Sequence, residues 1–339
     1  MVISKTPFRI SFFGGGTDYP VWFKEHGGAV LSTTINKYCY ITCRYLPPFF
    51  EHKSRVAYSK MEYVSSNEQI DHPSVRECLR FMKIQAGIEI HHDGDLPART
   101  GLGSSSSFTV GLLQTLNALQ QRMPSRMQLA RDAIHVEQDM IQENVGCQDQ
   151  VAVALGGFNK IVFHPSGEIT PEPIVIRNDR FQHFQDHLVM IFSGFARNAS
   201  AIAAKQISNT PKKHAELSAM RKMVDEAVSI LTGSGPLDDL GKLLHESWML
   251  KRSLADNISM PDVDRIYEAG LKHGALGGKL LGAGGGGFLL FFVRPQERAR
   301  LLSGLDKLLH IPFRFENSGS TILFYDPSER ESDFLALKP

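Results

Sequence analysis

The segment 97-PARTGLGSSSS-107 decides the predicted fold, because it places a glycine loop directly before a helix. The apolar-periodic run FTVGLLQTLNAL follows at 108–119, so the serines crowd the N-terminus of that helix. Unpaired backbone N–H groups and the positive end of the helix dipole favour a phosphate at such a terminus. One serine is sufficient to cap a helix and four are present, so we predict a phosphate-binding loop, with simple N-capping as the alternative.

A second glycine cluster stands upstream, where GGG at 14–16 follows the strand-like run FRISFF at 8–13. Consecutive glycines permit positive φ and let the backbone approach a ligand closely. Asp18 follows shortly after, and its carboxylate can accept hydrogen bonds from two sugar hydroxyls. We therefore predict a substrate loop here, and a tight turn capped by Asp18 is the alternative.

The third cluster, GAGGGG at 282–287, formally matches the dinucleotide fingerprint GxGxxG. That fingerprint opens a helix inside a βαβ unit, whereas here the strand-like run FLLFFV follows at 288–293. A Walker A loop is excluded as well, because Lys279 is followed by Leu280 instead of serine or threonine. The VAIK, HRD and DFG motifs of protein kinases are absent too. These familiar nucleotide-binding classes are therefore excluded.

Glu137 lies in a predicted amphipathic helix over 126–143 and has apolar residues at its i±3 and i±4 positions. A carboxylate buried among such neighbours needs a cation. Magnesium takes one or two protein oxygens in addition to nucleotide phosphates, which suits Glu137 together with the hydroxyl of Ser104 or Ser105. The alternative is an edge carboxylate that bends to solvent or pairs with an arginine.

Asp149 lies in GCQDQ at 146–150, just after that helix, and by itself it is typical of a helix cap. Phosphoryl transfer to an alcohol needs an oriented hydroxyl, a group that takes its proton, and cations on the phosphate. Asp149 can supply the first two requirements, and Arg9 can balance the charge. We therefore predict that Asp149 and Arg9 form the reacting centre.

Bulk composition indicates an ordinary folded protein. The chain has 339 residues with 42% hydrophobic and 22% charged residues, enough for two lobes or one large α/β unit. A formal net charge of +1 gives no global field that would recruit nucleic acid or a membrane surface. Four cysteines without CxxC spacing and the lack of any membrane-length apolar run lead us to expect free thiols and a cytoplasmic location. The oligomeric state stays open between a monomer and a homodimer.

The predicted elements define an α+β protein with a sheet-forming first part and a helix-rich second part. We place the boundary between two domains, 1–185 and 186–339. Strands are predicted at 28–45, 55–64, 88–92, 159–164, 172–177, 187–193 and 320–325, and helices, besides those above, at 198–232, 236–255, 261–273 and 295–309.

The order of these motifs resembles the GHMP kinase superfamily over nearly the whole chain. The run from Pro7 to Tyr19 is similar to the substrate motif of that family, 97–107 to its ATP-phosphate loop, and 279–288 to its C-terminal glycine motif. The resemblance implies two lobes with the active site between them, a ribosomal-protein-S5-like N-terminal lobe and a ferredoxin-like C-terminal lobe. It also implies ATP and Mg²⁺ as cofactors and a small-molecule sugar phosphate as the other partner.

Family roles carry over onto matching positions. The resemblance implies Asp149 as the base with Arg9 beside it, and Ser105 and Glu137 as magnesium ligands. For the sugar it implies Gly15, Gly16, Thr17 and Asp18. For ATP it implies Pro97, Gly101, Leu102, Gly103, Ser104, Ser105, Ser106, Ser107, Gly284 and Gly285.

The substrate motif departs from that of galactokinases, which usually have Gly-Glu-His-Thr-Asp-Tyr where this chain has GGGTDY at 14–19. The runs RISFFGGGTDYP and SGFARNASAI instead resemble bacterial D-glycero-D-manno-heptose 7-phosphate kinases, a branch that phosphorylates the anomeric C1 hydroxyl. The alternatives are a related kinase of L-fucose, or a sugar or nucleotide sensor that has lost catalysis. For the distal phosphate, Arg197 before a predicted helix is the first candidate and Lys37 the second.

Overall fold

The computed structural model describes residues 1–195, 199–326 and 330–335. Within them the strands form two sheets. The larger has nine strands, with β12-β1-β2-β5-β3-β4 as its main path, β11 and β6 joined to β2, and β7 joined to β6. The smaller has the order β8-β10-β9. The bounds are β1 Val2–Phe13, β2 Gly28–Tyr45, β3 Ser54–Ala57, β4 Met61–Val64, β5 Ile88–Gly94, β6 Phe158–Phe163, β7 Ile169–Pro173, β8 Leu188–Phe192, β9 Ala275–Leu280, β10 Phe288–Val293, β11 Phe315–Glu316 and β12 Thr321–Tyr325.

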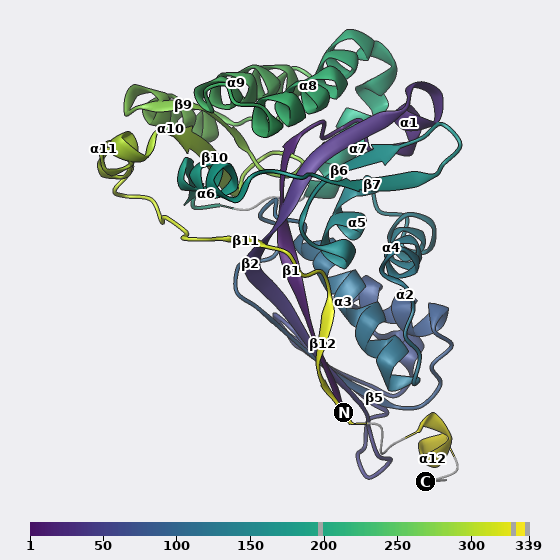
Figure 1. Cartoon of the computed structure of the whole chain (residues 1–339). Helices are drawn as coiled ribbons and strands as arrows, with labels where there is room; N and C mark the ends of the chain where they lie inside the picture. The colour runs from purple at the N-terminus through teal and green to yellow at the C-terminus, as the bar shows by residue number, and fades with distance from the viewer. Residues whose placement is uncertain (196–198, 327–329, 336–339) are drawn as a thin grey trace.

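The long antiparallel strands β1 and β2 form the centre of the sheet in the first lobe (Figure 1). Its β-branched and aromatic residues fit a pleated surface that is buried along much of its length. Helix α3 (Ser104–Leu119) packs on both strands, and α5 (Gln148–Leu155), α4 (Arg126–His135) and α2 (Pro73–Phe81) lie on the same side (Figure 1). The predicted phosphate loop therefore ends at a helix that is fixed against the central strands.

The second lobe is built around β10, whose six residues FLLFFV are all buried. A strand that is apolar on both faces must be covered on both sides. Helices α9 (Asp238–Arg252) and α10 (Pro261–Lys272) contact β9 beside it, and Phe184 of α6 (Asn178–Asp186) stacks on Phe292. This mixture of helices and two sheets is the predicted α+β class.

The C-terminal part of the chain returns to the first lobe (Figure 1). Strand β12 pairs with β1, and β11 pairs with β2. Residues 315–325 therefore belong to the large sheet by strand pairing, whereas the division at 185/186 had placed them in the second lobe. The position of the domain boundary itself stays a prediction.

Several predicted elements have different bounds in the structure. The helix predicted over 126–143 is an α-helix only to His135 and continues as a π-helix over Val136–Met140. The strand predicted at 172–177 lies earlier, at Ile169–Pro173. The helical stretch 198–232 is divided into α7 (Ala199–Asn209) and α8 (His214–Thr232) around Thr210–Lys212, and the one at 295–309 is reduced to α11 (Arg298–Gly304) after a short 3₁₀ turn.

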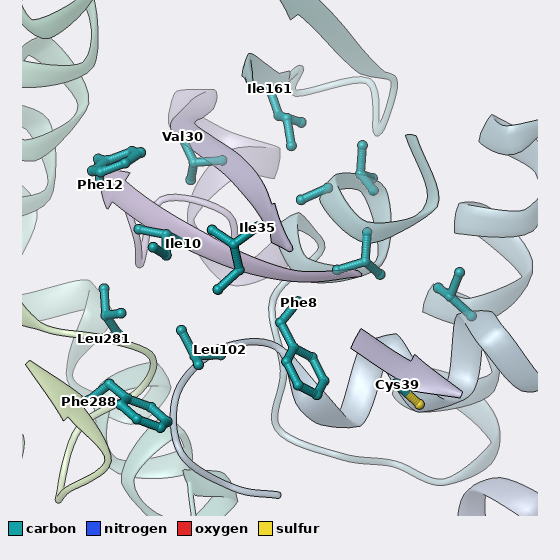
Figure 2. Packing of buried hydrophobic residues seen from close by; sticks show 14 of the residues in the cluster. Phe8, Ile10, Phe12, Val30, Ile35, Cys39, Leu102, Ile161, Leu281 and Phe288 are labelled. Atoms are coloured by element: carbon teal, nitrogen blue, oxygen red, sulfur yellow. The ribbon is translucent and has the colours of Figure 1, made fainter. Parts of the chain in front are cut away.

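The glycine loops are anchored in the apolar core through their neighbours. Figure 2 shows Leu102, from the loop before α3, close to Leu281 and Phe288, which flank the third glycine cluster. All three side chains are at most 1% exposed. Among the described residues all four cysteines are free and buried, as expected, and no helix is long and apolar enough to cross a bilayer.

Candidate active site

A pocket of about 310 Å³ lies where the two lobes meet, within the range of small-molecule sites. The first lobe supplies the end of β1, the loop after it, the loop before α3 and the segment 143–149. The second lobe supplies Lys251 of α9, Lys279 of β9, and Gly282 with Ala283. Residues from all three glycine clusters thus line the same pocket.

The loop before α3 has a main-chain conformation suited to binding a phosphate group. Gly103 is left-handed with φ +73° and ends the loop, and the helix begins at Ser104. Ser104, Ser105 and Ser106 all line the pocket, so the first helical turn faces it with its N–H groups. Ser104 Oγ also accepts a hydrogen bond from the backbone N–H of Arg99 at 3.0 Å, which closes the loop.

The third glycine cluster mainly supports that loop. A Cβ on Gly101 would lie 2.2 Å from the carbonyl oxygen of Leu281, and one on Gly282 would lie 2.4 Å from the Cα of Gly101. The backbone N–H of Gly285 donates to the Ile258 carbonyl at 2.9 Å. Gly282 and Ala283 line the pocket, whereas Gly284 and Gly285 do not, and the ATP contact of Gly284 and Gly285 stays a prediction.

Arg9 and Asp149, which both line the pocket, form a bidentate ion pair. Arg9 Nε donates to Asp149 Oδ1 and Nη2 to Oδ2, both at 2.7 Å. Arg9 Nη1 donates to the Gly101 carbonyl at 2.7 Å, so the pair is tied to the loop before α3. The Arg9 side chain is 4% exposed and that of Asp149 24%, so the carboxylate is the partner that a ligand can reach.

Asp18 is held at the centre of a polar network. Its Oδ1 accepts from the Gly16 backbone N–H at 2.8 Å, and its Oδ2 accepts from Gln148 Nε2 at 3.0 Å. Gln148 Oε1 accepts in turn from Ser11 Oγ. Burial raises the pKa of Asp18, while the Gly16 N–H acts in the opposite direction. Thr17 is buried and donates to the carbonyls of Gly14 and Ala29, so it shapes the loop and does not line the pocket.

Glu137 is fully buried in the π-helix, a form that occurs often at functional sites. Its Oε2 accepts from Ser106 Oγ at 2.9 Å and from Gln150 Nε2. The expected sharing of a magnesium ion with the hydroxyl of Ser104 or Ser105 stays a prediction. Burial raises the pKa of Glu137 to about 7. Its Oε1 is buried and has no hydrogen-bond partner among the described residues, so this oxygen is available to a cation.

A magnesium ion fits these residues. No group of three metal-ligating side chains occurs among the described residues, but Mg²⁺ bound with a nucleotide needs only one or two protein oxygens. Glu137 Oε1 and the serine hydroxyls at the start of α3 would supply them. The role of Ser105, which is exposed, stays a prediction.

Sequence reasoning missed Gln148, Lys251 and Lys279 as pocket residues. Lys279 Nζ donates to the carbonyls of Ser11 and Phe12, which joins β9 to the end of β1. Lys251 had a usable signal, because Leu244, Trp248 and Lys251 are spaced i, i+4, i+7 on the buried face of α9. A lysine on the apolar face of a helix is a reason to expect a ligand-binding site there.

Two residues were predicted to contact the distal phosphate, and the structure describes one of them. Arg197 lies outside the described residues. Lys37 lies in β2 and is not among the lining residues.

The comparisons with known proteins agree with this architecture. The N-terminal domain model of the GHMP kinases matches residues 73–157, and their C-terminal model matches residues 216–310. The chain belongs to the GHMP kinases. As a member of this family it is an enzyme that uses ATP as its phosphoryl donor.

The sequence identity to individual members of the family is low. The D-glycero-alpha-D-manno-heptose 7-phosphate kinase of Campylobacter jejuni is 27% identical over 90% of this chain and 93% of that protein. The L-fucokinase/L-fucose-1-P guanylyltransferase of Bacteroides fragilis is 24% identical over 89% of this chain but only 35% of that protein. The crystal structure of a D-glycero-D-manno-heptose 1-phosphate kinase from Bacteroides thetaiotaomicron superposes with a TM-score of 0.76 at 21% identity, covering 96% of this chain and all of that one. That structure shares the fold.

Proposed function

We propose that the protein transfers the γ-phosphoryl group of ATP to the anomeric C1 hydroxyl of D-glycero-D-manno-heptose 7-phosphate, giving the 1,7-bisphosphate. The observation that carries the proposal is the Arg9–Asp149 pair, fixed between the helix terminus that suits ATP phosphates and the Asp18 network that suits a sugar. The heptose assignment is supported by the glycine-rich substrate loop and by the Campylobacter relative.

The residues have separate tasks in this reaction. The sugar hydroxyl donates to an Asp149 oxygen, because each carboxylate oxygen keeps a lone pair after the bond from Arg9. Asp149 takes the proton as the oxygen attacks the γ-phosphorus, the bond to the β-phosphate oxygen breaks, and ADP leaves. Arg9 holds the Asp149 carboxylate in position, and the N–H groups at the start of α3 hold the phosphates. Bound magnesium would neutralise phosphate charge at the site of Glu137 and the serines.

The test is product identification. The purified protein is incubated with ATP, Mg²⁺ and one of four acceptors, heptose 7-phosphate, the unphosphorylated heptose, L-fucose or D-galactose, and the product is characterised by phosphorus NMR. We expect a new anomeric phosphate on heptose 7-phosphate, formed faster than on the other acceptors. A clear preference for L-fucose would favour the fucokinase alternative, and a product phosphorylated away from C1 would reject the anomeric position.

A further inference from the structure

Lys251 is a buried cation on the wall of the pocket. It lies near the C-terminus of α9, its side chain follows the apolar stripe of Leu244 and Trp248, and the residue is only 7% exposed. A lysine commonly buries its hydrocarbon stem and keeps its ammonium group in water. Here the ammonium group is buried as well, which is unfavourable unless it is well partnered.

The hydrogen bonds of Lys251 in the structure do not use its full donor capacity. Its Nζ donates to Gln206 Oε1 at 2.8 Å. Its other hydrogen bond, to the Gly15 carbonyl, is long at 3.5 Å. An ammonium group has three N–H bonds. Among the described residues it therefore has one short partner and retains donor capacity that a ligand in the pocket can use.

Gln206 of α7 holds Lys251 in this position. Because lysine only donates, the amide oxygen of Gln206 must face Lys251, and this fixes the amide nitrogen on the other side. Within the part of the chain that the structure describes, that nitrogen is buried without a hydrogen-bond partner, and it lies 2.5 Å from where a Cβ on Gly16 would be. A second unused donor thus lies against the glycine loop that lines the pocket.

The charge around Lys251 indicates which ligand group it binds. Asp18 and Lys251 line the same pocket, and their charges interact. Arg9 and Lys279 are also close enough for their charges to interact with that of Lys251, but a phosphate placed between Lys251 and Asp18 would be repelled by the Asp18 carboxylate beside it. A hydroxyl fits instead, because it can accept from Lys251 and donate to Asp18 at the same time.

We propose that Lys251 of α9, held by Gln206, binds a sugar hydroxyl together with Asp18 and thereby determines which sugar the pocket accepts. The inference rests on the proposed function in one respect only, that the substrate is a sugar. It assigns Lys251 to the sugar ring, so the distal phosphate of a sugar phosphate is held elsewhere.

The test compares Lys251→Met with Lys242→Met. Methionine keeps most of the stem and removes the charge, and Lys242 is a matched control because it lies exposed on the same helix in an ion pair with Asp239. kcat and the KM values for ATP and sugar are measured with the best acceptor of the panel, in its phosphorylated and unphosphorylated forms. We expect Lys251→Met to raise both sugar KM values by about tenfold or more, with the KM for ATP within about twofold, and Lys242→Met to change neither.

Each outcome separates this inference from the proposed function. If L-fucose or D-galactose is the best acceptor and its KM rises in Lys251→Met, the heptose assignment fails and the role of Lys251 holds. If heptose 7-phosphate is the best acceptor and its KM is unchanged, the role of Lys251 fails alone. A rise confined to phosphorylated sugars would also overturn the inference, since Lys251 would then bind the phosphate.

Two further measurements cover variants that do not fold and an inactive wild type. If Lys251→Met does not fold, Gln206→Met removes the acceptor that positions the lysine, and a KM rise for the sugar of about threefold is expected. An unchanged KM in that variant would overturn the inference. If the wild type turns over no sugar, calorimetry tests binding of the same sugars, and the absence of binding would overturn both proposals.

Discussion

The loop before α3 and the third glycine cluster are both glycine-rich, yet their glycines serve different purposes. In the first loop, Gly103 leaves room for charged groups, because a Cβ there would lie 3.0 Å from Arg9 Cγ and 3.4 Å from Asp149 Oδ2. In the third cluster, a Cβ on Gly284 would meet the backbone of Ile258, and one on Gly287 that of Thr100. Changes around the first loop should therefore alter turnover, and changes in the third cluster should alter stability.

The largest effect is expected where the two regions touch, at Gly101. Its φ is +87°, and a Cβ on it would lie 2.2 Å from the Leu281 carbonyl oxygen. Gly101→Ala therefore strains the main chain at Gly101 and also displaces the segment around Leu281. We expect a loss of about 3 kcal/mol or more in the free energy of unfolding, measured by denaturant titration.

Gly167→Ala is the control for this prediction. Gly167 has nearly the same φ, +90°, but nothing lies within 4 Å of its Cβ position. Only the left-handed conformation is penalised, by about 1–2 kcal/mol. Equal losses in the two variants would show that the contact between the glycine regions is not tight.

Asp149→Asn should have the next largest effect, on turnover instead of stability. Asparagine keeps the shape but cannot take the proton of the sugar hydroxyl or balance the charge of Arg9. We expect kcat to fall by about 100-fold or more, with ATP affinity nearly unchanged, measured by steady-state kinetics and calorimetry. A loss of less than about tenfold would favour a positioning role over proton transfer, because the transition state of phosphoryl transfer is loose.

These contrasts also show which elements and site residues could be predicted from the sequence, and why the others could not. The order of strands and helices follows local patterns, and the motifs for Arg9, Asp18 and Asp149 lie in short runs, so both could be predicted. The hydrogen bonds from Ser106 and Gln150 to Glu137 could not be predicted, because they join side chains of three separate helices. The Lys251–Gly15 contact and the β1–β12 pair join residues far apart in the chain, and no local pattern reports them.

Gly284→Ala tests the third cluster directly. Its φ is +123° and a Cβ would lie 2.7 Å from the Ile258 carbonyl oxygen. We expect a loss of about 2 kcal/mol in the free energy of unfolding and a KM for ATP within about twofold of the wild-type value. A strong rise of that KM in folded protein would instead support the ATP contact predicted from the sequence at Gly284 and Gly285.

Glu137→Gln should give the smallest of these effects, on the magnesium requirement. The amide keeps the size of the side chain and an oxygen for the Ser106 hydroxyl, but it loses the charge that attracts a hard cation. The unpaired Oε1 of Glu137 is the atom expected to face the ion, so the Mg²⁺ concentration for half-maximal rate should rise by about tenfold at saturating ATP. Glu143→Gln is the comparison, because Glu143 is an acidic residue that lines the pocket and burial raises its pKa as well. Since Glu143 is only partly buried and near Arg99, its loss should change the requirement less. If Glu143→Gln has the larger effect, the ion is held near Glu143 and not beside the π-helix.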